Sequence, residues 1–415
     1  MRILIVSNLY PPHVIGGYEQ ACHDTVEGLR ARGHHVEVLT STYGVERPVS
    51  AHGIHRLIRL HSFWTAQSPP EGWPALFKHA LCSQWSLRAL LRSVRPDIIY
   101  VWSMTGMPMS LLTVAQRGDA PIVFSIQDRW LLTDLQRDRW FLAWTYRSRS
   151  STRRITKAAL RAFIDAFVPT CLPAPRGESA QYISQAFAAI YAQAKWHFAR
   201  ERVIYNGIDT SHFGLNKRDH TARPYRMLFI GQLVPWKGAH TAIETLALLV
   251  RQRGRDIGTL TIVGASRDAA YQERLRQMVR AHALDTLVTF VGAVPRARTA
   301  TLYAEHDVLL FPSSWIEGFS LVLLEALACA LPVVGTITGG SAEILQDGVT
   351  GLTVPPNDAP ALLRQAGRLI DDPALAHRLA TTGATIVRQR FDQRHIIMQV
   401  EGYLGAVIEA ARPCR

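Results

Sequence analysis

Two glutamates interrupt the most apolar stretch of the chain, EGFSLVLLEALACALPVVG at residues 317–335. This stretch does not fit a membrane span, because Glu325 would lie near the bilayer centre and Pro332 follows within two turns. A buried helix that happens to carry two surface glutamates is one interpretation. The other is a site: since a helix rises about 1.5 Å per residue, the two backbones lie only about 12 Å apart. Glu317 in a loop and Glu325 in the following helix can then converge on one ligand.

The residues between the two glutamates indicate the chemistry of that ligand. Gly318, Phe319 and Ser320 begin the predicted helix, and the free N–H groups of a helix start favour an anion such as phosphate. Carboxylates accept hydrogen bonds from neighbouring hydroxyl groups. Sugar hydroxyls together with phosphate describe a nucleotide sugar.

Residues of a similar kind follow other predicted strands. In LFIGQLVPWKGAHTA, Lys237 stands at the start of a helix, where it adds a cation to a place that already favours negative charge. Gly16 and Gly17 precede another helix and let a ligand approach the backbone closely. Gly264 and Gly292 each follow a strand. Such glycines suit a flat base held between loops, and they are equally what tight turns require.

Short apolar runs alternate with helical patterns in both halves of the chain. Runs that are apolar on both faces and separated by helices predict parallel sheets covered on both sides. The fold class is therefore α/β, with two doubly wound domains over residues 1–210 and 211–393, followed by a long helix at 394–415. Residues 134–178 break the alternation and are predicted to be a helical insertion. The predicted strands are 2–7, 35–40, 97–102, 121–126 and 180–184 in the first half, and 225–231, 259–264, 287–292, 307–312, 331–335 and 351–355 in the second.

The basic character of the chain points to an anionic partner. Its net charge is +13 over 415 residues, and six basic residues lie at 140–161, just after Trp140, Phe141 and Trp144. Two interpretations of this segment are open. It is either a solvated basic helix, or an aromatic and basic surface that docks on an anionic membrane. No nucleic-acid-binding module accompanies the charge. The six basic residues are Arg147, Arg149, Arg153, Arg154, Lys157 and Arg161.

The cysteines and the start of the chain bear on location. The five cysteines are scattered without a Cys-x-x-Cys pair, which argues against a disulfide framework or a zinc site. The first apolar run is too short for a signal peptide and fits a buried strand. The expectation is a cytoplasmic protein, peripheral at the inner face of the membrane if the basic segment docks there.

The chain resembles the GT-B glycosyltransferases of family 4, the group-1 retaining type, over nearly its whole length. The stretch at 317–335 is similar to the E-x7-E motif of that family, and GGSAEILQDGVTGLTVPPND is its usual continuation. The landmarks MRILIVSNLYPP…GGYE, VIYNGIDTSHF and GQLVPWKG follow in the family's order. The resemblance implies two Rossmann-like domains facing across a cleft, with the last helix crossing back to the first domain. It also implies a nucleotide-diphosphate sugar as donor, an acceptor bound by the first domain, no cofactor and no catalytic metal. The lack of an Asp-x-Asp sequence agrees with the last point.

The resemblance also assigns roles to residues. Glu317 would face the donor sugar, Glu325 the ribose hydroxyls, and Lys237 the diphosphate. The expected donor-binding set is Gly16, Gly17, Gln232, Lys237, Gly264, Gly292, Val294, Gly318, Phe319, Ser320 and Glu325, and the expected catalytic set is Glu317, Gln127 and Asp128.

Two positions depart from the family pattern. Gln232 stands where many relatives carry Arg, which removes one positive charge from the leaving-group site. Gln127 stands before Asp128 where many relatives place His, and an amide cannot titrate. The favoured function is a metal-independent retaining glycosyltransferase that acts on the hydroxyl of a glycan or lipid-linked glycan. The alternative is a non-catalytic sugar-nucleotide-binding partner of another transferase.

Overall fold

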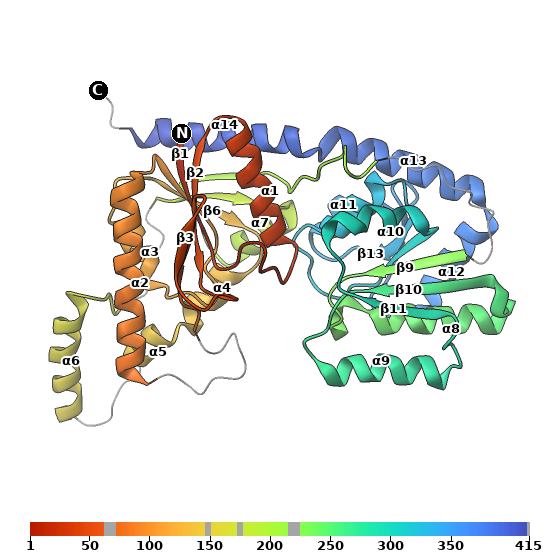
Figure 1. Ribbon diagram of the computed structural model, residues 1–415, viewed down its shortest axis with the longest axis horizontal. Helices are drawn as coiled ribbons and strands as arrows, with labels where there is room; N and C mark the ends of the chain where they lie inside the picture. Colours follow the sequence, from red (N-terminus) through yellow and green to blue (C-terminus); the bar gives the residue numbers. More distant parts are fainter. Residues whose placement is uncertain (62–71, 146–150, 172–176, 215–224, 413–415) are drawn as a thin grey trace. The chain divides into compact units, whose positions relative to one another are not determined.

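The computed structural model describes the chain except for residues 62–71, 146–150, 172–176, 215–224 and 413–415. It divides into two compact units, each with its own parallel sheet (Figure 1). The first unit comprises residues 1–183, 187–204 and 397–415, and the second comprises 184–186 and 205–396. This architecture is the GT-B fold class predicted from the sequence.

The first unit is built on an eight-stranded sheet in the order β3-β4-β2-β1-β5-β6-β7-β8, parallel except where β3 pairs with β4. Its central strands are buried along nearly their whole length, because helices cover both faces. The strands are β1 (Arg2–Ser7), β2 (His35–Ser41), β3 (Val49–Ala51), β4 (Ile54–Ile58), β5 (Ile98–Ser103), β6 (Ile122–Ile126), β7 (Ser179–Tyr182) and β8 (Arg200–Val203). The helices are α1 (Tyr18–Ala31), α2 (Trp73–Val94), α3 (Ser110–Gln116), α4 (Trp130–Arg137), α5 (Arg139–Thr145), α6 (Ser151–Asp165) and α7 (Gln185–Gln193).

The second unit carries a six-stranded, all-parallel sheet in the order β11-β10-β9-β12-β13-β14. Its strands are β9 (Tyr225–Ile230), β10 (Gly258–Val263), β11 (Val288–Gly292), β12 (Val308–Phe311), β13 (Val333–Thr336) and β14 (Leu352–Val354). Its α-helices are α8 (Ala239–Arg253), α9 (Ala269–Ala281), α10 (Thr299–Glu305), α11 (Leu321–Ala328), α12 (Ala359–Asp371) and α13 (Pro373–Arg390). Short 3-10 turns are η2 (Pro235–Lys237), η3 (Arg255–Ile257), η4 (Arg296–Arg298) and η5 (Gly340–Glu343).

The last helix, α14 (Gln393–Ala411), belongs to the first unit from Ile397 onward. It packs on α1, where a Cβ added to Gly28 would lie 2.7 Å from Ile397 Cγ1. The buried Tyr403 hydroxyl donates to the carbonyls of Ala180 and Arg200, at 2.9 and 3.0 Å. This helix therefore ties β7 and β8 to the rest of the unit.

The predicted aromatic membrane surface at 140–161 is wrong in its aromatic part. Trp140, Phe141 and Trp144 are buried, and the Trp140 indole N–H donates to the Pro169 carbonyl at 2.6 Å. Trp73 packs against Trp140 and Trp144, with ring centroids 5.5 and 4.6 Å apart. The aromatic cluster is thus core of the first unit, formed where α5 meets the start of α2.

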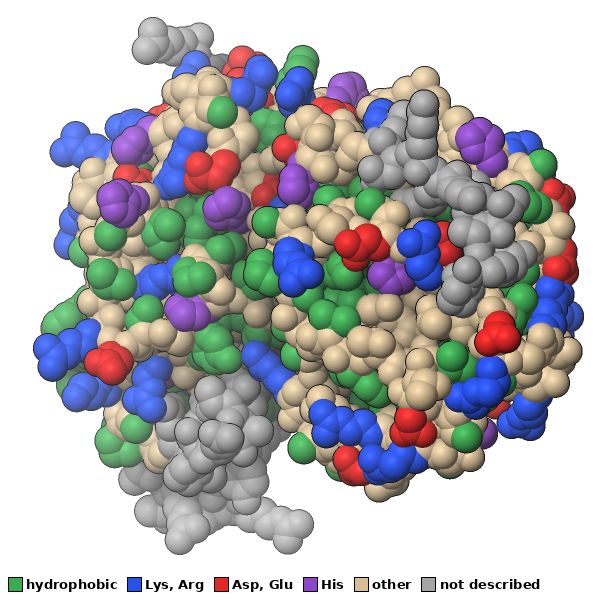
Figure 2. Space-filling view, turned by 45° about the vertical axis from the view of Figure 1, so that its right-hand side comes forward, with side chains coloured by type: hydrophobic (Ala, Val, Ile, Leu, Met, Phe, Trp, Pro, Cys, Tyr) green, Lys and Arg blue, Asp and Glu red, His purple; other side chains and the backbone are tan. Residues whose placement is uncertain are grey.

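The basic part of that segment is only partly described. Arg147 and Arg149 lie outside the described residues, as do the side chains of Arg153, Arg154 and Lys157. The Arg161 guanidinium donates to the Thr170 hydroxyl at 2.9 Å. On the face seen in Figure 2, Lys and Arg side chains are spread out with Asp and Glu among them rather than gathered in one patch. Among the described residues, no helix has both the length and the hydropathy needed to cross a bilayer.

Candidate functional site

The loops that follow β9 and β12 are joined to each other in the second unit. Gly238, between η2 and α8, has φ +80°, and a Cβ there would lie 2.3 Å from the Pro312 carbonyl oxygen. Only glycine fits such a contact, which brings the end of η2 against the end of β12. The backbone N–H of Ser314 donates to the Trp236 carbonyl at 2.8 Å and closes the junction.

This junction places Lys237 beside Glu317, although the two are 80 residues apart in the chain. The Lys237 ammonium donates to Glu317 Oε1 at 2.6 Å, and the buried Ser313 hydroxyl donates to the same oxygen at 2.5 Å. Glu317 is buried, and an unpaired charge there would be costly, so Lys237 and Ser313 compensate its desolvation. A cation and a carboxylate that are both held at the carboxyl end of β12 can bind a phosphate and a sugar hydroxyl, respectively.

The loop that carries Glu317 leads directly into the start of α11. The Ser320 hydroxyl accepts from the Leu323 N–H at 3.4 Å and caps the helix. Phe319 is buried and its ring lies against those of Tyr205 and Phe391, with centroids 4.8 and 5.3 Å apart. The Phe319 side chain therefore anchors the loop, and it is the backbone at Gly318–Ser320 that the expected donor role would use.

Glu325 lies inside α11 and has two partners that the sequence did not reveal. The Tyr303 hydroxyl donates to Glu325 Oε2 at 3.0 Å, and the Arg296 guanidinium donates to Oε1 at 3.4 Å. Burial and then the neighbouring Glu325 charge hold the pKa of Tyr303 well above its ordinary value, so this phenol stays a neutral donor. Arg296 follows β11 in η4, two residues after the predicted Val294, and its guanidinium lies 5.9 Å from the centre of the Phe213 ring. Its place after a strand end was the signal that could have identified it.

Glycines at the ends of β9, β10 and β11 hold these strand ends close together. A Cβ added to Gly264 would lie 1.8 Å from the Gly231 carbonyl oxygen, and Gly264 has φ +146°. The Gly264 N–H donates to the Gly292 carbonyl at 2.8 Å. The strand ends themselves thus require glycine at 264, whatever ligand lies beside them. Gln232 follows Gly231 at the same edge and is half-buried, as is Val294.

In the first unit, Gln127 and Asp128 follow β6. Gln127 is buried, and its amide nitrogen donates to the Ser125 hydroxyl at 2.7 Å. Asp128 Oδ1 accepts from the Trp130 N–H at 2.7 Å. Burial, with smaller contributions from the charges of Asp134 and Glu19, raises the pKa of Asp128 to about 6. The titratable group at this strand end is therefore the carboxyl group of Asp128, since the side chain of Gln127 cannot titrate.

The backbone N–H groups of the loop before α1 already have a carboxylate partner. Glu19 is buried and accepts from the N–H groups of Ile15 and Gly16, at 3.2 and 2.9 Å. Gly17 is the N-cap of α1. A phosphate that binds the backbone of Gly16 would have to compete with the carboxylate of Glu19, which was not among the predicted site residues.

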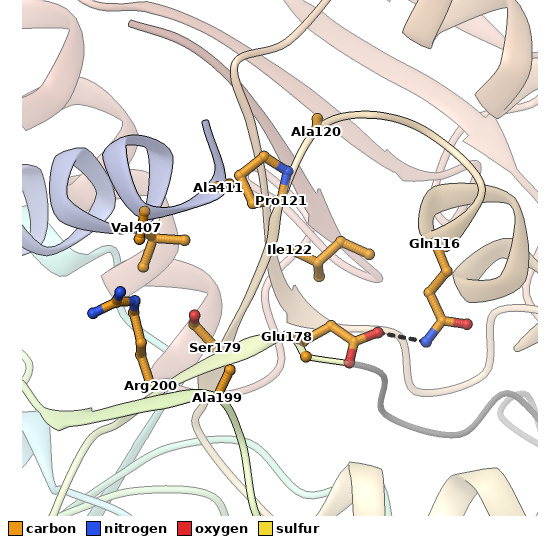
Figure 3. A pocket seen from close by; sticks show the side chains of 12 residues that line it. Gln116, Ala120, Pro121, Ile122, Glu178, Ser179, Ala199, Arg200, Val407 and Ala411 are labelled. Atoms are coloured by element: carbon orange, nitrogen blue, oxygen red, sulfur yellow. Dashed lines mark hydrogen bonds between the residues drawn. The ribbon is translucent and has the colours of Figure 1, made fainter. Parts of the chain in front are cut away.

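A separate pocket of about 480 Å³ lies in the first unit, at the opposite edge of the sheet (Figure 3). It is lined by the first residues of β6, β7 and β8 and by the end of α14. The Glu178 carboxylate accepts there from the Gln116 amide at 2.5 Å. This pocket lies at the amino ends of the strands. Gln127 and Asp128 lie at the carboxyl end of β6, the end at which ligands of open parallel sheets bind, so the pocket is separate from them. Among the described residues, no group of three or more His, Cys, Asp or Glu side chains is arranged to hold a metal ion.

Comparison with known proteins identifies the family of the chain. Residues 15–212 match the family described as "Glycosyltransferase Family 4", and residues 215–385 match "Glycosyl transferases group 1". The chain belongs to the group-1 glycosyltransferases of the GT-B fold, and it is a glycosyltransferase enzyme, as predicted.

Individual relatives cover most or about half of the chain. A glycogen synthase of Mycobacterium tuberculosis is 29% identical over 94% of this chain and 91% of its own length. A D-inositol 3-phosphate glycosyltransferase of Pseudarthrobacter chlorophenolicus is 34% identical over 46% of each. Among solved structures, sucrose-phosphate synthase from Thermosynechococcus elongatus is similar with a TM-score of 0.73 at 22% identity over 99% of both chains. HepE of Anabaena in complex with UDP has a TM-score of 0.67 at 22% identity, over 98% of this chain and 100% of its own.

The strand-end glycines give a stability prediction. Gly264→Ala should lower the free energy of unfolding by several kcal/mol, because the new Cβ overlaps the Gly231 carbonyl and the backbone conformation disfavours a side chain. Gly292→Ala is the matched control, since its φ is +80° but a Cβ there meets nothing within 4 Å. It should cost only about 1 kcal/mol. Urea unfolding of the two variants measures the difference, and equal losses would contradict the packing argument.

Proposed function

We propose that this glycosyltransferase is a metal-independent, retaining enzyme that moves a sugar from a nucleotide-diphosphate donor to a hydroxyl of a glycan or lipid-linked glycan. The observation that carries the proposal is the contact of Lys237 and Ser313 with Glu317 at the strand ends of the second unit. Complexes of HepE with UDP and with UDP-glucose make UDP-sugars the first donors to test.

In the proposed donor complex, Lys237 moves from Glu317 to the diphosphate. Its flexible four-carbon stem allows this without a backbone change, and a lysine binds phosphate as a point charge. Glu317, freed of one donor, accepts hydrogen bonds from hydroxyls of the donor sugar. Glu325 accepts from the ribose hydroxyls while Tyr303 continues to donate to its other oxygen. With Gln232 in place of a cation, Lys237 carries more of the leaving-group charge.

The proposed transfer takes place on one face of the sugar. The bond from the anomeric carbon to the diphosphate oxygen breaks, and a bond to the acceptor oxygen forms on the same side. The acceptor proton passes to the departing phosphate oxygen, so that no protein base is required. Gln127 and Asp128 then orient hydroxyl groups from the first unit. The backbone of Gly16 and Gly17 is proposed to assist the diphosphate, with Glu19 displaced from the Gly16 N–H.

Donor binding tests the second unit. Lys237→Ala and Glu325→Ala should each weaken UDP-sugar binding by about 1.5–3 kcal/mol, since each removes a charged hydrogen bond to the donor. Lys195→Ala, a change far from these loops in sequence, is the control and should leave the affinity unchanged. Isothermal titration calorimetry measures the dissociation constants. Unchanged affinity in both site variants would remove the basis for the donor assignment.

Transfer rate against pH tests the first unit. Gln127→Ala should lower the rate without adding or removing a titration step, and Gln127→His should be tolerated. The raised pKa of Asp128 means that its carboxylate is lost as the pH falls through about 6. The rate of the parent should therefore fall below that pH, and Asp128→Asn should remove this step.

Glu317→Ala should lower the transfer rate far more than either substitution of Gln127, because the Glu317 carboxylate would lie against the reacting sugar. EDTA should leave the parent rate unchanged. A Glu317→Ala enzyme of full activity, or a strict requirement for Mg²⁺ or Mn²⁺, would contradict the proposed chemistry.

We also propose that the enzyme docks on anionic membranes, through a surface different from the aromatic one predicted. Leu160 and Phe163 are exposed in the second half of α6 and Phe167 is exposed just after it, and the two phenylalanine rings lie 5.4 Å apart. Exposed aromatic and aliphatic side chains of this kind can enter the interfacial layer of a bilayer, and the net charge of +13 favours anionic lipid.

Liposome co-sedimentation tests the docking surface. Pelleting of the parent should rise with anionic lipid content and fall with added salt. The double variant Phe163→Ser, Phe167→Ser should pellet less, whereas Met398→Ser, an exposed apolar residue of α14, should behave as the parent. Equal pelleting with neutral vesicles, or no pelleting with any vesicle, would contradict membrane docking and support the interpretation of this segment as a solvated helix.

A further inference from the structure

Four large apolar side chains are exposed on the loops that carry the Lys237–Glu317 pair. Trp236 is 44% exposed and Trp315 is 54% exposed, while Ile316 and Ile337 are 43% and 49% exposed. They come from the loops after β9, β12 and β13. We call these four residues the tryptophan platform. Exposed apolar groups of this size that gather in one place mark a binding surface.

The backbone under the tryptophan platform is fixed. The Trp236 carbonyl accepts from the Ser314 N–H at 2.8 Å, and the Trp315 carbonyl accepts from the Thr338 hydroxyl at 2.5 Å. The Glu317 carbonyl accepts from the Gly340 N–H at 2.8 Å. These bonds link all three loops, so the backbone that carries the two indoles and Glu317 is fixed by contacts between loops.

The two indole rings contact each other while their outer surfaces stay open. Their centroids lie 5.7 Å apart with an angle of 40° between the planes. The face of an aromatic ring carries partial negative charge. It attracts groups with partial positive charge, such as the C–H groups of a sugar ring, whose carbons are bonded to oxygen. One side of a pyranose ring presents several such C–H groups, and its hydroxyls point to the edges.

The neighbours of the platform favour a sugar over a purely apolar partner. Trp236 immediately precedes Lys237, and Trp315 stands two residues before Glu317. An acyl chain or an apolar protein surface would have to desolvate this ion pair without replacing its hydrogen bonds. A sugar stacks on the indoles with its C–H face and still offers hydroxyls to polar groups nearby.

We propose that Trp236 and Trp315 form a stacking platform for a sugar ring of the acceptor, and that the acceptor is therefore a saccharide rather than a small polyol. This inference rests on the proposed function, in which Lys237 and Glu317 hold the diphosphate and the donor sugar. The two indoles are exposed on the same loops as this pair, whereas Glu317 is buried. The resemblance implied acceptor binding by the first domain, and this inference adds a contact of the acceptor with the second unit.

The test uses the full chain and a panel of α- and β-linked gluco-, manno- and galacto-oligosaccharides of two to seven units. Glycan binding is measured with UDP present, and UDP binding is measured separately by calorimetry. The parent should bind at least one oligosaccharide, more tightly as its length increases from two units. Trp236→Ala and Trp315→Ala should each weaken that binding about tenfold or more, with UDP affinity unchanged. Trp85→Ala, which removes an exposed indole of α2, is the matched control and should bind the glycan as the parent does.

Replacement by another aromatic residue separates stacking from loop structure. Trp236→Phe and Trp315→Phe should retain most of the glycan affinity, because a flat ring remains. The proposal is overturned if the parent binds no oligosaccharide, if the alanine variants bind glycan as the parent does, or if they lose binding to phosphatidylglycerol vesicles instead. Failure of the parent to bind UDP, GDP and ADP and their sugars would overturn the proposed function, and that result is read independently of the glycan panel.

Discussion

The close approach of Gly238 to the Pro312 carbonyl is the constraint on which the rest of the second unit's site depends. It brings two strand ends together, and the Ser314 to Trp236 hydrogen bond then fixes the loops in register. This junction brings Lys237 to Ser313 and Glu317, which already contact each other within one loop. The tryptophan platform rests on the same backbone. One steric requirement at a single glycine thus positions a cation, a carboxylate and an apolar surface.

The buried charges of both units follow one electrostatic rule. Each carboxylate that loses water is given hydrogen-bond donors from its own unit: Lys237 and Ser313 for Glu317, or backbone N–H groups for Glu19. A phosphate would compete with the carboxylate for Lys237, and sugar hydroxyls can serve as hydrogen-bond donors in its place. These carboxylates are thus compensated by partners within the chain.

Sequence pattern was sufficient for the parts of the fold that are buried on both sides. Strands such as β1, β5 and β12 are continuous apolar runs, and each lies within a residue or so of its predicted position. The strands β3, β4 and β8 were missed. β3 and β8 are short, largely exposed edge strands that carry no apolar run, and the short β4 (IHRLI) has polar residues in its middle. Trp140 and Trp144 were misplaced because a basic neighbourhood in sequence says nothing about which face of a helix packs inward. Glu317, Glu325 and Lys237 were singled out as candidates from motif spacing. Ser313, Tyr303 and Arg296 were not, since only the folded structure shows their contacts with the two glutamates.

The placement of α14 has a consequence for how the chain acquires its structure during synthesis. Residues 397–415 belong to the first unit but leave the ribosome after the whole of the second unit, residues 205–396. Until then β7 and β8 lack the Tyr403 hydrogen bonds, and the face of α1 at Gly28 lacks the cover of Ile397. The second unit is almost continuous in sequence and can mature first, although it is translated second. The first unit is therefore complete only after α14, the last helix, has been synthesised and has packed on it.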